Sequence, residues 1–174
     1  MNSLQNKKIK LRALEPEDLE FLFAIENNEN FWEVSNTLTP FSKDILQQYL
    51  NNAHQDIYEV KQLRLVIVDI ISNKNIGLID LFDFNPHHKR AGIGVLILKE
   101  YQNNGFASET LKLFINYAFK KLGLHQIYAN IPCDNINSVK LFKKLHFNLI
   151  GTKKDWLLVN EKYIDVNLYQ LINT

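Results

Sequence analysis

The sequence predicts a mixed α/β fold in which a mostly antiparallel sheet is flanked by helices. Three strand-like segments, at 63–69, 76–85 and 90–98, follow one another with only short polar turns between them. Turns of this length join antiparallel neighbours. A helical pattern over 105–122 then leads to another strand-like segment at 126–131. Because a helical crossover joins parallel strands, we expect one parallel pair inside this sheet.

The other elements are placed by local signals. Residues 9–14 alternate apolar and polar side chains, which predicts a half-buried strand. The acids and proline at 15–18 suit the first turn of a helix. After an irregular segment at 31–39, Ser42 is the expected N-cap of a second helix. The chain closes with a short helix after Asn135 and two strands, at 147–158 and 162–171.

Composition limits the classes of protein that the chain can belong to. Its 174 residues suit one domain over 1–174 and are too few for two ordinary domains. With a net charge of +1, the chain lacks the excess of positive charge that binds nucleic acid or acidic membranes. The single cysteine, Cys133, fits a reducing compartment, and the polar start at 1–10 lacks a signal-peptide core. We therefore expect a cytoplasmic protein with no nucleic-acid or membrane partner.

A polar glycine turn between a strand and a long helix is the main functional signal. The first N–H groups of a helix have no intrahelical partner, and the helix dipole adds positive charge there, so such a turn can hold phosphate. A glycine lets the pyrophosphate approach the backbone. Plain connections also use such turns, so both interpretations stay open on physics alone. We call this segment the phosphate turn; it comprises Gln102, Asn103, Asn104, Gly105, Phe106 and Ala107.

The phosphate turn also carries a family resemblance. Its Gln-x-x-Gly-x-Ala pattern resembles the (Arg/Gln)-x-x-Gly-x-(Gly/Ala) acyl-CoA signature of the GNAT N-acetyltransferase superfamily. Two further segments follow in the family's order. One is Asn-Ile-Asn-Ser at 135–138, and the other is Leu-Phe-Lys-Lys-Leu-His-Phe at 141–147, which resembles Leu-Tyr-x-Lys-Leu-Gly-Phe. The resemblance extends over 9–171 and implies the GNAT acyl-CoA N-acyltransferase fold.

Within the superfamily, the sequence is most similar to the spermidine/diamine N-acetyltransferases. The ribosomal-protein-type amino-terminal acetyltransferases come next. The segments that carry this likeness lie at 11–19, 76–81, 88–91 and 160–166. The resemblance implies acetyl-CoA as cosubstrate and, as acceptor, a small-molecule amine or a peptide amino terminus.

The resemblance also assigns roles to individual residues. The phosphate turn would hold the pyrophosphate, Asn135 would orient the pantetheine arm, and Ser138 would reach the same arm or the thiol. Backbone N–H groups at the end of the third meander strand would stabilise the developing charge on the carbonyl oxygen. These N–H groups belong to Leu96, Ile97 and Leu98.

The chemistry itself calls for a base, because an alkyl ammonium with a pKa of about 10.4 is mostly protonated at neutral pH. A partly buried carboxylate is the usual proton acceptor. Asp80 interrupts a strand between Leu78 and Phe82, and Glu33 lies in the predicted loop between the first two helices. The alternatives are a strand-edge carboxylate satisfied by a neighbour for Asp80, and a solvated loop acid for Glu33.

One residue departs from the family pattern at a chemically important place. Phe142 stands where the family often has a tyrosine that protonates the departing thiolate, and a phenyl ring cannot donate a proton. Either water or another group then does so, or the chain is a non-catalytic CoA-binding regulatory module. A core position is the simplest interpretation of Phe142.

The remaining expectations concern the acceptor, metals and assembly. The segment 34–41 is nearly uncharged where polyamine enzymes are acidic, so a monoamine or a peptide amino terminus stays open as acceptor. The adjacent pair His87 and His88 has no further spaced ligands, so no metal is expected. The exposed edges of the closing strands are a candidate surface for a homo-oligomer.

Overall fold

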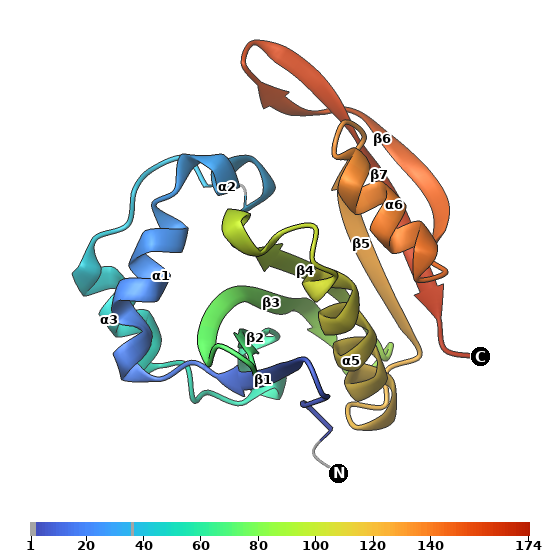
Figure 1. The fold of residues 1–174 in the computed structure, drawn as a ribbon. Coiled ribbons are helices and arrows are strands. Elements are labelled where there is room, and N and C mark those ends of the chain that lie inside the picture. The colour runs from blue at the N-terminus through green and yellow to red at the C-terminus, as the bar shows by residue number, and fades with distance from the viewer. Residues whose placement is uncertain (1–2, 36) are drawn as a thin grey trace.

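The computed structural model describes residues 3–35 and 37–174, and most of these residues belong to a seven-stranded sheet and the helices around it (Figure 1). The strand order is β1-β2-β3-β4-β5-β7-β6. Neighbouring strands are antiparallel except for the parallel pair β4 and β5, as predicted. The strands are β1 (Ile9–Ala13), β2 (Leu63–Asp69), β3 (Lys74–Asn85), β4 (Arg90–Ile97), β5 (Gln126–Pro132), β6 (Asn148–Val159) and β7 (Lys162–Ile172).

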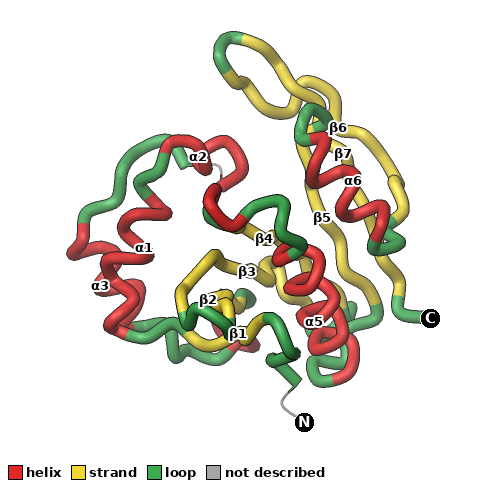
Figure 2. The backbone as a smooth tube through the Cα atoms, viewed as in Figure 1, coloured by secondary structure: helices red, strands yellow, loops and turns green. Residues whose placement is uncertain are grey.

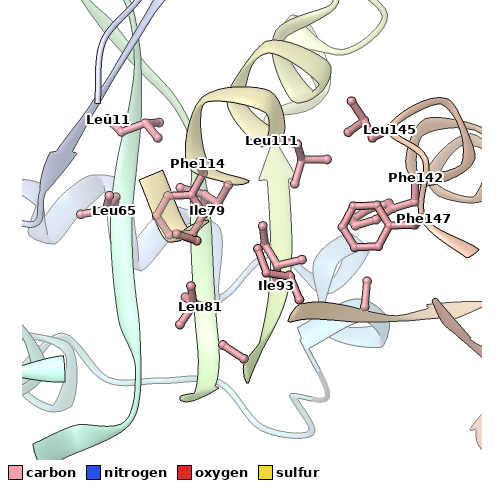
Figure 3. Close-up of a cluster of buried hydrophobic side chains, with 14 of the residues drawn as sticks. Leu11, Leu65, Ile79, Leu81, Ile93, Leu111, Phe114, Phe142, Leu145 and Phe147 are labelled. Carbon is pink, nitrogen blue, oxygen red and sulfur yellow. The ribbon is translucent and has the colours of Figure 1, made fainter. Parts of the chain in front are cut away.

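Helices cover both faces of the sheet. Because successive side chains of a strand point to opposite faces, one strand contributes to the hydrophobic cluster on each face. In β2, Leu65 and Ile67 belong to the hydrophobic cluster that includes helices α5 (Phe106–Lys120) and α6 (Ile136–Lys144). Figure 3 shows part of this cluster. Val66 and Val68 belong to a second cluster, with α1 (Leu19–Glu26) and α3 (Lys43–Asn51). A strand buried on both faces reads as a continuous apolar run, as this one does.

Two short helices were not predicted. The segment 31–39, expected to be irregular, includes most of α2 (Glu29–Ser35), which Figure 2 shows as a helix. The other is α4 (Ile57–Val60), which precedes β2. In the structure, α2 is joined to α1 by a contact that no local sequence pattern reveals: the indole N–H of Trp32 donates to the carbonyl of Glu26 at 2.8 Å. The predicted N-cap is confirmed, since the Ser42 hydroxyl accepts from the N–H of Ile45 at 3.2 Å. No helix among the described residues is long and apolar enough to cross a membrane.

The sheet is split between β4 and β5. These strands pair only at their first residues, Arg90 with Gln126, Ala91 with Ile127 and Gly92 with Tyr128. Beyond Gly92 they diverge, and β5 continues paired with β7 (Figure 1). The second half of β4 therefore faces a wedge-shaped opening instead of a strand.

His146 follows the end of α6, at the position of the glycine in the Leu-Tyr-x-Lys-Leu-Gly-Phe pattern that the sequence resembles. His146 adopts a left-handed conformation with a φ of 66°. Its N–H donates to the carbonyl of Lys143, and the N–H of Phe147 donates to that of Phe142. These two bonds form a Schellman motif, which usually has glycine at the left-handed position. The rings of Phe142 and Phe147 pack edge to face with centroids 5.0 Å apart, so Phe142 is a core residue, as the simplest interpretation held.

An ion pair with a buried carboxylate ties the first strand to the helix after it. Asp18 accepts from both terminal nitrogens of Arg12, at 2.7 and 2.8 Å, and from the side chain of Asn75 at 3.1 Å. The backbone N–H of Glu15 also donates to Asp18, at 2.8 Å. Burial by itself would raise the pKa of Asp18, but these hydrogen bonds and the charge of Arg12 lower it below its ordinary value.

Candidate active site

A cleft of 1420 Å³ occupies the opening between β4 and β5 and continues toward α1 and α2. Most of the predicted site residues line it. Of the whole predicted set, only Leu98 and Asn104 do not. The predicted residues along the cleft are Glu33, Asp80, Leu96, Ile97, Gln102, Asn103, Gly105, Phe106, Ala107, Asn135, Ser138 and Phe142.

The phosphate turn presents its backbone to the cleft. Gly105, directly before α5, has a φ of 78°, a conformation that glycine adopts without strain. Among the described residues, the backbone N–H groups of residues 105–108 donate no hydrogen bond. Free N–H groups at the start of a helix suit an anion, so the turn fits the pyrophosphate of CoA.

Gln102 fixes the turn to the sheet. The side-chain amide of Gln102 donates to the backbone carbonyl of Ile97 at 2.9 Å. The backbone carbonyl of Gln102 accepts from the side-chain amide of Asn104, also at 2.9 Å. The amide nitrogen of the Gln102 side chain supports the turn from the end of β4.

The backbone of β4 offers fewer donors than the sequence predicted. The N–H of Leu98 donates to the carbonyl of Ile76 at 2.9 Å, so it points toward β3 and is not available to a ligand. Successive N–H groups of a strand alternate in direction. The N–H of Leu96 therefore also faces β3, whereas that of Ile97 faces the opening. Ile97 is the one residue of the predicted three with an N–H directed at the cleft.

Asn135 and Ser138 meet at the start of α6. The side-chain oxygen of Asn135 caps the helix by accepting from the N–H of Ser138 at 3.2 Å. The cap occupies the amide oxygen, and the amide nitrogen of Asn135 has no acceptor among the described residues. Both side chains line the cleft on the side opposite β4.

Asp80 belongs to a charged cluster that the sequence reasoning did not assemble. The guanidinium of Arg64 donates to both oxygens of Asp80, at 2.6 and 3.2 Å, and to Glu26 at 2.5 Å. The ring of Tyr49 lies 5.9 Å from the guanidinium carbon. Burial alone would lower the pKa of Arg64, but the two carboxylates raise it above its ordinary value. The only sequence signal was Arg64 itself, a charge inside an apolar strand.

The other polar candidates are distributed unevenly. Glu33 is exposed and lines the cleft from α2, in a helix and not in the predicted loop. The hydroxyl of Ser108, missed from the sequence, is buried beside the cleft and has no partner among the described residues. Tyr128 donates to Asp83 at 3.0 Å and does not line the cleft. Burial, and then its bond to Asp83, raise the pKa of Tyr128 to about 12.

An open sheet with the phosphate turn on one side of the cleft and a carboxylate cluster on the other is the arrangement expected of an acyl-CoA-dependent acyltransferase. The family of acetyltransferase (GNAT) domains matches residues 8–148. The chain belongs to this GNAT family and is an acetyl-CoA-dependent N-acetyltransferase. The family and the enzyme class predicted from the sequence are confirmed.

Its relatives agree with this family assignment. Spermidine N(1)-acetyltransferase of Vibrio cholerae is 31% identical over 169 residues, which are 97% of this chain and 95% of the relative. The putative ribosomal N-acetyltransferase YdaF of Bacillus subtilis is 25% identical and is matched over 96% of this chain and 92% of its own.

Solved structures of the Vibrio cholerae enzyme share the fold. Its complex with CoA and spermine is 29% identical, covers 96% of both chains and superposes with a TM-score of 0.87. A dodecameric structure of the same enzyme in an intermediate state is 29% identical, covers 96% of this chain and 95% of that chain, and has a TM-score of 0.80.

Proposed function

We propose that the chain transfers the acetyl group of acetyl-CoA to a primary amine of a polyamine or diamine, by direct attack in a ternary complex. The observation that carries this proposal is that one cleft contains both the phosphate turn and the cluster of Glu26, Arg64 and Asp80. With two carboxylates and one guanidinium, this cluster has a net negative charge suited to an ammonium group. The Vibrio cholerae relative that binds CoA and spermine supports the choice of acceptor.

Acetyl-CoA supplies an activated acyl group as its thioester. The free N–H groups of the phosphate turn would hold its pyrophosphate, and Asn135 and Ser138 would hold the pantetheine arm. The N–H of Ile97 would donate to the carbonyl oxygen as negative charge develops there. Fixing both reactants in one cleft removes much of the entropic cost of their meeting.

Asp80 is the proposed proton acceptor for the amine. Arg64 occupies both of its oxygens from one side and so fixes the direction of the carboxylate. The ammonium loses one proton to Asp80, and the neutral nitrogen then forms a bond to the acetyl carbon. As the carbon–sulfur bond breaks, the second proton passes from this nitrogen to the departing sulfur. Because Phe142 cannot protonate the thiolate, water in the open cleft relays this proton. Glu33, on the rim of the cleft, would face the far end of the acceptor.

A peptide amino terminus is the second candidate acceptor. The segment after α2, residues 37–41, carries no charge, and its Leu38 side chain is 87% exposed. A polycation gains little from such a segment, whereas an apolar peptide can contact it. The similarity to YdaF points the same way.

We propose that the chain also forms a homo-oligomer through the edge strand β6. The β6–β7 hairpin exposes large apolar side chains on Trp156, Leu158 and Tyr163. The Vibrio cholerae relative has a dodecameric structure. Light scattering coupled to size-exclusion chromatography tests this: a mass above that of the 20.4 kDa monomer supports it, and a monomer at micromolar concentration contradicts it.

The acceptor is tested by following thiol release from acetyl-CoA with polyamines, diamines, monoamines and short peptides. Calorimetric titration with CoA runs in parallel. We expect the highest kcat/KM with a polyamine or diamine. Turnover confined to peptides would replace the acceptor, and tight CoA binding without turnover of any amine would contradict the proposed reaction.

A further inference from the structure

The side chain of Lys8 lies against the phosphate turn. Its ammonium donates to the backbone carbonyl of Asn104. It also lies 4.6 Å from the centroid of the Phe106 ring. A Cβ atom added to Gly105 would come within 3.5 Å of the same ammonium. A positive charge is thus placed directly at the start of α5.

This position is electrostatically unfavourable for a lysine in the free protein. The start of a helix carries partial positive charge, so a cation there is repelled unless an anion lies nearby. Among residues 3–35 and 37–174, no carboxylate lies within ion-pair distance of Lys8, and its charge interacts with Asp69 only at longer range. Glu109, in the first turn of α5, instead pairs with Lys112 at 3.1 Å.

The sequence around Lys8 fixes its backbone. The side-chain oxygen of Asn6 accepts from the N–H groups of Lys8 and Ile9, at 2.8 and 2.9 Å. The side-chain nitrogen of Asn6 donates to Glu109 at 3.3 Å. The segment before β1 is therefore anchored to the first turn of α5, and Lys8 is held beside the phosphate turn.

We propose that Lys8 binds a phosphate group of CoA and completes the anion site of the phosphate turn. The proposal rests on the proposed function, because it assumes CoA at this turn. A phosphate would accept a charged hydrogen bond from the ammonium, and its negative charge would also be stabilised by the helix dipole at the start of α5. The Asn104 carbonyl and the Phe106 ring hold the ammonium in place until phosphate binds. Lys8 lies 94 residues before Gln102 in the sequence (102 − 8 = 94), so the turn motif alone does not reveal it.

The test is the calorimetric binding of CoA and of pantetheine, which lacks phosphate, to the full chain and to Lys8→Met. Methionine keeps an unbranched apolar stem over Phe106 but removes the charge. We expect CoA to bind about tenfold more weakly, as for the loss of one charged hydrogen bond. Pantetheine binding should not change, and the loss should shrink as salt is added. The melting temperature without ligand should be unchanged or higher, because a repulsion is removed.

Lys10→Met is the matched control, since Lys10 is an exposed lysine of β1 two residues further along. It should bind CoA as the unmodified protein does, and Lys8→Arg should restore most of the affinity. Equal loss of CoA and pantetheine, or a lower melting temperature with unchanged CoA affinity, would mean that Lys8 only anchors β1. Unmodified protein that binds no CoA would instead overturn the proposed function.

Discussion

Arg64 donates to both carboxylate oxygens of Asp80, through Nε at 2.6 Å and Nη2 at 3.2 Å. Paired contacts of this kind fix the orientation of a carboxylate as well as its position. The same guanidinium reaches Glu26 on α1, so one side chain of β2 connects an acid on a helix to an acid on β3. Under the proposed function, Arg64 is therefore a positioning residue for the acceptor end of the cleft.

Replacing Asp80 by Asn should remove the proton acceptor while keeping the shape of the side chain. We expect kcat/KM for the amine to fall by about 10²- to 10⁴-fold, the usual contribution of a general base. CoA affinity should be unchanged, because the phosphate turn lies at the other end of the cleft. Steady-state kinetics and CoA calorimetry measure the two quantities. Asp83→Asn is the control, since Asp83 does not line the cleft; equal losses in both variants would exclude Asp80 as the base.

Gly105→Ala should weaken CoA binding through the backbone. An added Cβ meets only the Lys8 ammonium, at an ordinary 3.5 Å, so crowding of neighbours is not the cause. At the φ of 78°, an alanine is less stable than a glycine by about 1–2 kcal/mol. The backbone would relax away from this conformation, and that movement would reorient the free N–H groups.

Gly123→Ala separates strain from binding. Gly123 has a similar φ of 65° and open space around it, but it follows α5 at its far end. Both variants should lose similar stability in urea unfolding, and only Gly105→Ala should lose CoA affinity. Unchanged CoA affinity in Gly105→Ala would remove the phosphate turn from the site.

Phe142→Tyr should raise turnover by supplying a proton donor to the departing thiolate. Phe142 packs on Phe147 but also lines the cleft, so a hydroxyl at the ring tip is expected to reach it. A positioned acid typically contributes about 10²-fold or more, and a gain approaching this size in kcat is expected. Tyr128→Phe serves as the control, because the Tyr128 hydroxyl is bound to Asp83 outside the cleft. If Phe142→Tyr leaves kcat unchanged, water suffices as the proton relay.

Asp18→Asn should lower stability in a pH-dependent way. The pKa of Asp18 is lowered in the folded protein, so its contribution is present above the unfolded pKa of about 3.9 and is lost as the pH falls through the folded value. At neutral pH we expect a loss of about 2 kcal/mol, the scale of hydrogen bonds to a charged group. In urea unfolding across pH, the difference from the unmodified protein should shrink below about pH 4. Glu17→Gln, an exposed neighbour, should show no such trend.

The elements that could be predicted from the sequence are those with strong local patterns. Residues 63–69 were predicted as a strand and form β2 with the same bounds, because an apolar run between turns has few alternatives. The parallel pairing of β4 and β5 followed from the helical crossover. The helix α2 was missed because its tertiary contact, from Trp32 to the carbonyl of Glu26, leaves no periodic signal.

The candidate site was predictable only where function depends on a contiguous motif. The phosphate turn is such a motif, and it lies where the sequence placed it. The pairing of Asp80 with Arg64 depends on the register of β2 and β3, in which these two residues are opposite each other. The direction of the N–H of Leu98 depends on its bond to Ile76. Neither relationship can be inferred before the strands are aligned.

The divergence of β4 and β5 has a consequence for hydrogen exchange. The amide protons of Val95 and Ile97 point into the opening and lack the strand partner that would slow their exchange with solvent. Three register pairs join β4 to β5, so β4 has no strand partner on this side beyond Gly92. In the free protein, these amide protons in the middle of the sheet should therefore exchange as fast as those of an edge strand. A ligand bound between β4 and β5 should slow their exchange to the rate of an interior strand.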